Sequence, residues 1–323
     1  MTEKENSGAF RTTIGGQALI EGILMRGPEK QAIVVRSPEG LVVQEEELKL
    51  VRDRYPILGL PLIRGSVTFL DSMYRGVKAL MFSADFYPEE DPSAEEPSKF
   101  EKWLDEKLGN EKVEKAVIAF SVVVAVAFSI GLFMMLPTFL ASLVELVTDS
   151  VLIRNLVDAV LRIAIFMTYL ILVSRMKDIR RLFSYHGAEH KTIFCYERGL
   201  ELTVDNVRPM PKHHPRCGTS FMLVVIIVAI LINTVIFALF PVDNVFLRML
   251  IQLLLLPLVV GITYEFNRWV GRHVQDSRLA KILTAPGMWM QNFTTNEPDD
   301  SMIECAIRSL ELVLPSEKGK DEW

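Results

Sequence analysis

The residues best suited to chemistry lie in one stretch, Ser184 to Ser220, which holds four of the five histidines and two of the three cysteines. Its sharpest motif is His186-Gly187-Ala188-Glu189-His190. On a helix the two histidines stand on the same face, so both imidazoles can bind one cation. The carboxylate of Glu189 can then act as a base toward water activated by that cation. The order H-x-x-E-H is the inverse of the H-E-x-x-H motif of zinc proteases.

Further ligands are available close by in the sequence. His213, His214 and Cys217 follow in a loop that also contains three prolines. A catalytic zinc site needs three protein ligands and an open position. For the third ligand, Glu265 at the end of a long apolar segment competes with His214 and Cys217. If Cys217 binds together with His213 or His214, the site closes to four ligands and the metal is structural.

An isolated pair of histidines at this spacing more often caps a helix or pairs with carboxylates than binds a metal. Here a carboxylate lies between the two, and a second His/His/Cys group follows in the same stretch. These features favour a metal site, with zinc as the expected divalent ion. The sequence leaves open whether that metal is catalytic or structural.

The composition indicates a membrane protein with a substantial aqueous portion. Of the 323 residues 50% are hydrophobic and 23% are charged, and the mean hydropathy is +0.27. The net charge of −5 and the lack of an aromatic-basic motif argue against nucleic acid as a partner. Three cysteines fit reduced thiols in a cytosolic compartment rather than a disulfide framework. The N-terminus lacks the apolar core of a signal peptide, so we expect insertion to rely on internal segments.

Four apolar segments are long enough to cross a bilayer, which takes about 20 residues. They are Ala116–Val144, Leu156–Val173, Phe221–Phe240 and Phe246–Tyr264. Asp158 and Arg162 lie one helical turn apart near the start of the second segment, where we expect them to pair and to snorkel. Basic residues concentrate between the second and third segments. The positive-inside rule therefore predicts that this loop and both termini lie in the cytosol. The expected location of the protein is the plasma membrane.

The N-terminal part predicts a small β-structure followed by a helix. Two β-rich runs flank Pro38-Glu39-Gly40 and predict a hairpin. The glycines of residues 14–22 indicate backbone turns or a close approach of another segment rather than a packed helix. Glu21 and Arg26 then lie in loop-like structure, and Glu21 would need a partner if buried. Residues 55–83 predict an amphipathic helix, either in the membrane interface or packed on the hairpin. An acidic linker with three prolines follows at 88–98.

The helix of the second span is expected to continue without a break to Gly199, a residue suited to a left-handed C-cap. Gly187 within that helix costs about 1 kcal/mol relative to alanine, which predicts a close approach of another segment. Near the C-terminus, Asp299, Asp300 or Ser301 can cap a last helix. Its apolar face predicts docking on the cytosolic part, with Cys305 as a core thiol.

Together these patterns predict a mainly α protein: a four-helix transmembrane bundle with a small cytosolic α+β portion made of the N-terminal hairpin, the interfacial helix and the C-terminal helix. The expected divisions are a cytosolic segment with the hairpin at 1–54, the interfacial helix at 55–87, the acidic linker and a charged helix at 88–115, the four-span domain at 116–265 with its His-rich cytosolic loop at 175–218, and a cytosolic C-terminal segment at 266–323.

The sequence resembles the YqhQ-like family of bacterial membrane proteins, a family of unknown function often labelled predicted metal-dependent enzymes. The stretches that carry the resemblance are GGQALIEGILMRGP at 15–28, YHGAEHK at 185–191, HPRCGTSF at 214–221 and PGMWMQNFTTNEPDD at 286–300. They extend over nearly the whole chain. The resemblance implies a multi-pass bacterial membrane protein, and it brings no substrate and no verified ligands.

The leading hypothesis is a metal-dependent membrane enzyme, a zinc hydrolase at the cytosolic membrane face, with Glu189 as the base. Its metal ligands would come from His186, His190, His214, Cys217 and Glu265. The alternative is a non-enzymatic assembly, scaffold or metal-handling protein with a structural metal. The expected partners are the lipid bilayer and a substrate or protein that the sequence does not identify. Because four spans form a small bundle, homo-oligomerisation also remains open.

Overall fold

The computed structural model describes residues 10–48, 55–87 and 110–322, except 149, 243, 275 and 318. The predicted acidic linker at 88–98 lies outside the described residues. The chain divides into two compact units. One comprises 1–87, 169–232 and 255–323, and the other comprises 88–168 and 233–254.

The described part is mainly helical, and four of its helices are long and apolar enough to cross a membrane, as predicted. These spans are Phe120–Ser142, Val151–Val173 (α6), Gly218–Leu239 (α9) and Val245–His273 (α10). The first span combines α4 (Asn110–Ile130), a π-helical turn (Gly131–Met135) and α5 (Leu136–Ser142), after which a 3-10 turn covers Leu143–Leu146.

A four-stranded antiparallel sheet forms the centre of the first unit, in the order β1-β2-β3-β4. The predicted hairpin is confirmed as β3 (Lys30–Ser37) and β4 (Gly40–Glu47). The expectation of loop-like structure before it is confirmed for Glu21, which lies in the turn between two strands, and is wrong for the strands themselves, β1 (Gly15–Leu19) and β2 (Gly22–Arg26). The glycines serve close packing there: a Cβ on Gly22 would lie 2.5 Å from the carbonyl oxygen of Val34.

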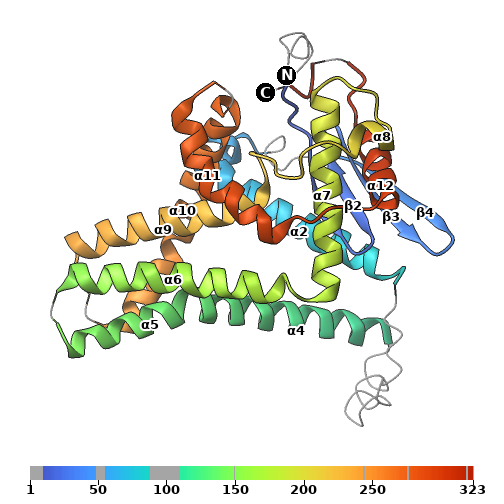
Figure 1. Ribbon diagram of the computed structural model, residues 1–323. Helices are drawn as coiled ribbons and strands as arrows, with labels where there is room; N and C mark the ends of the chain where they lie inside the picture. The colour runs from blue at the N-terminus through green and yellow to red at the C-terminus, as the bar shows by residue number, and fades with distance from the viewer. Residues whose placement is uncertain are drawn as a thin grey trace. The chain divides into compact units, whose positions relative to one another are not determined.

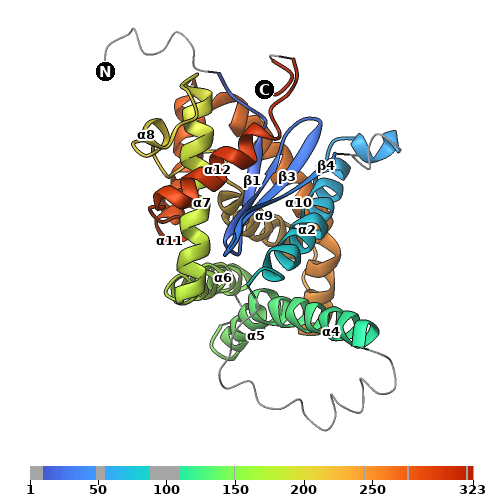
Figure 2. The ribbon, with the colours of Figure 1, turned by 90° about the vertical axis from the view of Figure 1, so that its right-hand side faces the viewer.

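Helices cover both faces of this sheet (Figure 2). One face packs against α7 (Lys177–Glu197) and α12 (Asp300–Glu311), which lie beside the sheet in Figure 1. The opposite face packs against α2 (Ile63–Ala84), which follows a 3-10 turn at Pro56–Gly59. Alternation along β2 explains the two layers, since Ile23 and Met25 enter the first core and Leu24 the second.

Helix α2 fits the prediction of a helix that packs on the hairpin, because Ala79 is buried among sheet residues. The same helix also leaves apolar side chains exposed: Leu70 is 65% and Tyr74 is 73% accessible. An exposed apolar stripe of this kind is what a membrane interface would cover. The interfacial position of α2 therefore stays a prediction.

The predicted continuity of α6 and α7 is wrong. Helix α6 ends at Val173, and α7 begins at Lys177 after Met176 adopts an extended conformation with ψ of 139°. No proline or glycine signals this break. Helix α7 is instead aligned by its packing on the sheet and on α12, and such tertiary contacts override local helix preference. The predicted C-cap is confirmed, because Gly199 has a φ of 66°.

The C-terminal part contains the predicted last helix and one that the sequence did not indicate. Asp299 caps α12 by accepting a hydrogen bond from Met302 N. The preceding α11 (Arg278–Thr294) includes Pro286 in its interior, and a short α8 (Val204–Val207) lies in the loop after α7. Between α11 and α12 the chain crosses α7 at Gly187, as the glycine predicted. A Cβ there would lie 2.0 Å from Asn296 O.

This crossing gives a first testable prediction. Gly187→Ala forces a methyl group against a backbone carbonyl, so we expect the free energy of unfolding to fall by roughly 1–3 kcal/mol. Thermal denaturation of the purified protein would measure it. The matched control is Gly131→Ala, another helical glycine, where a Cβ would meet no atom within 4 Å. Equal midpoints for the two variants would show that the crossing is loose.

Candidate metal centre

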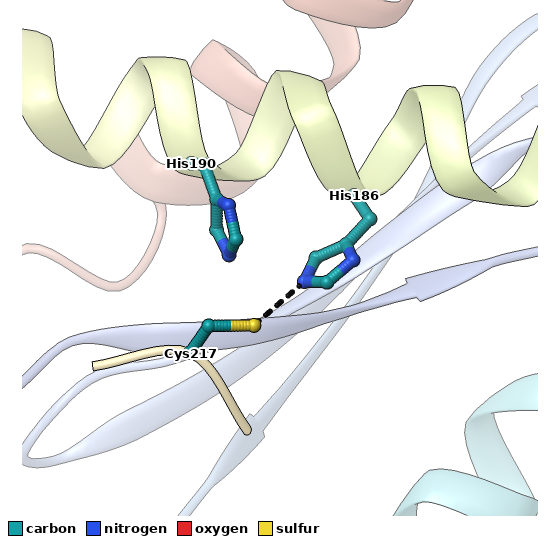
Figure 3. Close-up of side chains that lie close together, drawn as sticks. All are labelled: His186, His190 and Cys217. Carbon is teal, nitrogen blue, oxygen red and sulfur yellow. Dashed lines mark hydrogen bonds between the residues drawn. The ribbon is translucent and has the colours of Figure 1, made fainter. Parts of the chain in front are cut away.

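Helix α7 presents His186 and His190 from the same side, toward Cys217 (Figure 3). The two imidazole rings have centroids 4.3 Å apart, and both side chains are buried. The spacing of four residues thus places both imidazoles on one face of the helix, as the sequence predicted. One nitrogen of each ring, with Cys217 Sγ, belongs to a set of three donor atoms that all lie within 4.8 Å of one another.

Backbone carbonyls fix the orientation of both imidazoles. The Nδ1 atom of His186 lies 2.8 Å from Thr294 O, and that of His190 lies 2.6 Å from Lys212 O. A carbonyl oxygen only accepts hydrogen bonds, so each Nδ1 carries a hydrogen and each Nε2 of a neutral ring keeps its lone pair. Carbonyl partners of this kind orient histidines that bind metals in proteins. His186 Nε2 lies 3.2 Å from Cys217 Sγ.

Cys217 immediately precedes α9, and its sulfur accepts at the positive end of that helix. The Thr219 N–H donates to Sγ at 3.4 Å, and Thr219 Oγ1 lies 3.1 Å from it. Burial raises the pKa of Cys217, but His186 and His190 outweigh burial and hold this pKa well below its ordinary value. Burial lowers the pKa of His186, whereas Cys217 and Glu189 raise it, to about 9. Both shifts favour a thiolate–imidazolium pair when no metal is bound.

Glu189 lies between the two histidines in sequence and is buried. Its Oε1 accepts a hydrogen bond from Gly16 N at 2.9 Å, and its Oε2 has no partner among the described residues. Burial raises the pKa of this carboxyl, while the two histidines oppose the shift. A buried carboxylate oxygen without a donor is rare in proteins. It fits either a base that accepts a proton or a further metal ligand.

His214 supports the loop rather than joining the three donors. Its backbone N donates to Gln291 Oε1 at 2.8 Å, and Gln291 Nε2 donates back to His214 O at 2.8 Å. Its ring lies against Glu197, with Nε2 and Oε2 3.6 Å apart, and Arg216 pairs with the same carboxylate. Burial lowers the pKa of His214 to about 4, so this imidazole is neutral. The neighbouring His213 is also outside the set of three.

Glu265 is the other predicted ligand outside this set. Its two oxygens accept hydrogen bonds from Arg64, at 2.7 Å from Nε and 2.5 Å from Nη2. The sequence argument required a positive partner for this carboxylate. That partner is Arg64 of α2.

Several residues of the site were not anticipated. Gln291 holds the loop that carries Cys217, and the carbonyls of Thr294 and Lys212 orient the histidines. Backbone carbonyls leave no signal in a sequence. Gln291 and Thr294 do lie in the stretch PGMWMQNFTTNEPDD, which the sequence analysis quoted without giving it a role.

A cavity of about 750 Å³ adjoins the three donors. Its polar lining includes His186, Glu189, His190 and Cys217. Its lining also includes apolar side chains of α2 and of the start of α9, where Phe69 and Phe221 stack with ring centroids 5.8 Å apart. A small molecule or a group of a larger one can therefore reach the donor atoms.

Comparisons with known proteins find relatives without an assigned role. The family described as "Protein of unknown function (DUF1385)" matches residues 60–316. The "Uncharacterized protein YqhQ" of Bacillus subtilis (strain 168) is 33% identical over 307 residues, which cover 93% of this chain and 92% of that protein. No solved structure matches.

The geometry predicts that the purified protein binds about one zinc or cobalt ion per chain. We expect His186→Ala with His190→Ala to lose the ion, and Cys217→Ser to lose the thiolate-to-cobalt absorption band. Metal content is measured by mass spectrometry after loosely bound ions are removed. His273→Ala, which changes an exposed histidine outside the cluster, is the control and should keep the ion. A folded wild type without metal would contradict the site.

The pKa values predict how many protons leave when the metal binds. The raised pKa of His186, about 9, favours the protonated ring at pH 7.5, and the lowered pKa of Cys217 favours the thiolate. A metal ligand must be unprotonated, so binding should release about one proton from His186 and none from Cys217. Release should disappear above the pKa of His186.

Calorimetry in buffers of different ionisation enthalpy measures this release. Glu189→Gln tests whether the carboxyl contributes a proton, since its own pKa is raised. Cys217→Ser removes the thiolate that holds the proton on His186, so release should be strongly reduced. Unchanged release in Cys217→Ser would contradict the thiolate–imidazolium pair.

Proposed function

The chain belongs to the DUF1385 family, whose function is unknown, and from this premise we propose that it is a zinc-dependent hydrolase acting at the cytosolic face of a membrane. The single observation that carries the proposal is the convergence of His186 Nε2, His190 and Cys217 Sγ beside the unpartnered Oε2 of Glu189. The four helices able to span a membrane support the location.

The electrostatics of the cluster favour a bound cation. Two histidine rings with their Nδ1 atoms already bonded, the sulfur of Cys217 and the carboxyl group of Glu189 are all buried together. Burying such groups is costly unless each is paired. A divalent ion would satisfy the three donors at once, and the mixture of imidazole and thiolate ligands suits zinc.

A bound zinc ion supplies a Lewis acid that polarises the scissile group and acidifies water. The protein groups have distinct tasks around it. The Gly16 N–H holds Oε1 of Glu189, which leaves Oε2 available to take a proton from the attacking water. A carboxyl whose pKa is raised by burial is better matched to that transfer near neutral pH than an exposed one.

The cavity supports a substrate with both polar and apolar parts. Its donor side can bind a carbonyl or phosphoryl group, while Phe69, Phe221 and Met222 offer an apolar wall. Phe221 and Met222 belong to the start of α9, a helix apolar enough to span a membrane. Peptides, lipids and phosphorylated metabolites are all candidate substrates. The apolar side chains of the cavity favour those substrates that carry an apolar group.

The second candidate is a structural metal in a non-enzymatic assembly or scaffold protein. The same unpartnered Oε2 of Glu189 favours it, because this oxygen could become the fourth ligand and close the site. Oε2 of Glu189 is therefore a base in the first function and a metal ligand in the second. Substitution of Glu189 distinguishes the two.

Glu189→Gln is that test. Its amide oxygen can still accept from Gly16 N, so we expect the fold to persist. If Glu189 is the base, the variant keeps zinc and its turnover falls about 10²–10⁴-fold, the usual contribution of a general base. If Glu189 is a ligand, the variant loses zinc affinity. Zinc-loaded Glu189→Gln with full turnover would exclude the proposed base.

The measurement compares wild type and variant on esters, amides and phosphoesters that carry apolar groups, with zinc content determined in the same samples. Hydrolysis counts only when it depends on zinc and persists in His273→Ala. A preparation of His186→Ala with His190→Ala serves as the control for contaminating hydrolases, because they would be equally active in that variant, which lacks two of the proposed metal ligands.

A further inference from the structure

The second unit contains a buried polar cluster that the proposed function does not use. It lies among α5, α6 and α10 and is formed by Thr138, Asn155, Asp158, Arg162, Arg248 and Gln252, all buried. Charged side chains within membrane spans are costly and are retained for pairing or for function. The hydrogen-bond partners of each member show which charges are paired and which are not.

Arg162 and Asp158 satisfy each other. Arg162 Nε donates to Asp158 Oδ2 at 2.9 Å, and its Nη2 donates to Gln252 Oε1 at 2.8 Å. Thr138 Oγ1 contacts both the carboxylate and Arg162. This pair confirms the sequence expectation of an ion pair. Burial of both side chains replaces the expected snorkelling.

Arg248 has no such match. Only 5% of this residue is exposed, and its Nη2 donates to the neutral amide of Asn155 at 2.6 Å. The guanidinium also lies over the ring of Phe237, 4.3 Å from the centroid. Its Nε and Nη1 atoms are buried without any acceptor. Among the residues that the structure describes, no carboxylate pairs with it.

A small cavity lies beside these unpartnered N–H groups. It is lined by Arg248, Arg154, Asp158 and Thr138 and measures about 10 Å³. A space of this size accommodates about one water-sized atom. Asp158 also lines this cavity, but its oxygens accept hydrogen bonds from Arg162 and Thr138 rather than from Arg248.

We propose that Arg248 is the centre of an anion-binding site that takes one oxygen of a phosphate-type group. A guanidinium forms its strongest hydrogen bonds with charged oxygens, and a phosphate oxygen would satisfy N–H groups that water only partly compensates. Arg154 and Arg248 both lie in the first turn of their helices, α6 and α10. Lipid phosphates gather at the ends of membrane spans, so the group can come from a headgroup or from free phosphate.

The test measures the thermal midpoint of the full chain in micelles of dodecyl maltoside, which carries no phosphate, as sodium phosphate is raised at constant ionic strength. We expect the wild-type midpoint to rise by several degrees, because a ligand that binds only the folded state stabilises it. Arg248→Gln should show no rise. Arg175→Gln, which alters an exposed arginine, should respond like the wild type.

A second arm identifies the source of the group. Native mass spectrometry of protein purified from membranes rich in phosphatidylglycerol would show a retained anionic lipid in the wild type and its loss in Arg248→Gln. Retained lipid with no effect of inorganic phosphate indicates a headgroup site, and the reverse indicates a free anion. Neither effect in a folded wild type overturns the proposal.

Asn155→Asp keeps the proposal testable if Arg248→Gln does not fold. The substitution places a carboxylate at the position of the amide 2.6 Å from Arg248 Nη2 and so supplies an internal anion. We expect a higher midpoint without phosphate and a response to phosphate that is largely lost. A lower midpoint together with an undiminished response would show that the stabilising anion binds elsewhere.

Discussion

The crossing of the chain over α7 at Gly187 is the constraint on which the metal centre depends. Only a residue without a side chain lets Asn296 O approach so closely. Asn296 N then donates to Phe183 O, and Glu297 pairs with Lys191 at 2.7 Å, so the crossing segment is bonded on both sides of the glycine. Because Thr294 lies just before this segment, its carbonyl reaches His186. The glycine and the histidine are thus parts of one arrangement.

The sheet contributes to the centre through its edge strand. An edge strand presents backbone N–H groups that lack partners within the sheet. Glu189 accepts from the Gly16 N–H, which is not used by the ladder with β2. One contact therefore satisfies the edge and fixes the carboxylate. Strands that the sequence did not reveal, β1 and β2, turn out to hold the residue that it ranked as the base.

Local patterns predicted what depends on local chemistry. The spacing of His186 and His190, the cap at Gly199 and the close approach at Gly187 all follow from the geometry of one helix. The spans follow from apolar runs of sufficient length, and the β3–β4 hairpin from its turn residues. Tertiary contacts instead determine the break before α7, the continuation of α11 across Pro286 and the hydrogen bonds by which Gln291 holds the loop at His214. Nothing within a short window of sequence specifies those contacts, and backbone acceptors such as Thr294 O have no sequence signal at all.

The presence or absence of a partner for each buried charged group distinguishes structural polar residues from functional ones in this chain. Glu265 was attractive as a ligand because a carboxylate at the end of a span needs a positive partner, and Arg64 is that partner. Glu21 posed the same question, and Arg181 with Tyr185 answers it. Among the described residues, the buried atoms that still lack a hydrogen-bond partner include Oε2 of Glu189 and the Nε and Nη1 atoms of Arg248. Each also lines a cavity or belongs to a residue that does. A folded protein seldom retains such groups without a ligand to match them, so the sign of each charge indicates the sign of what binds: a cation beside Glu189 and an anion beside Arg248.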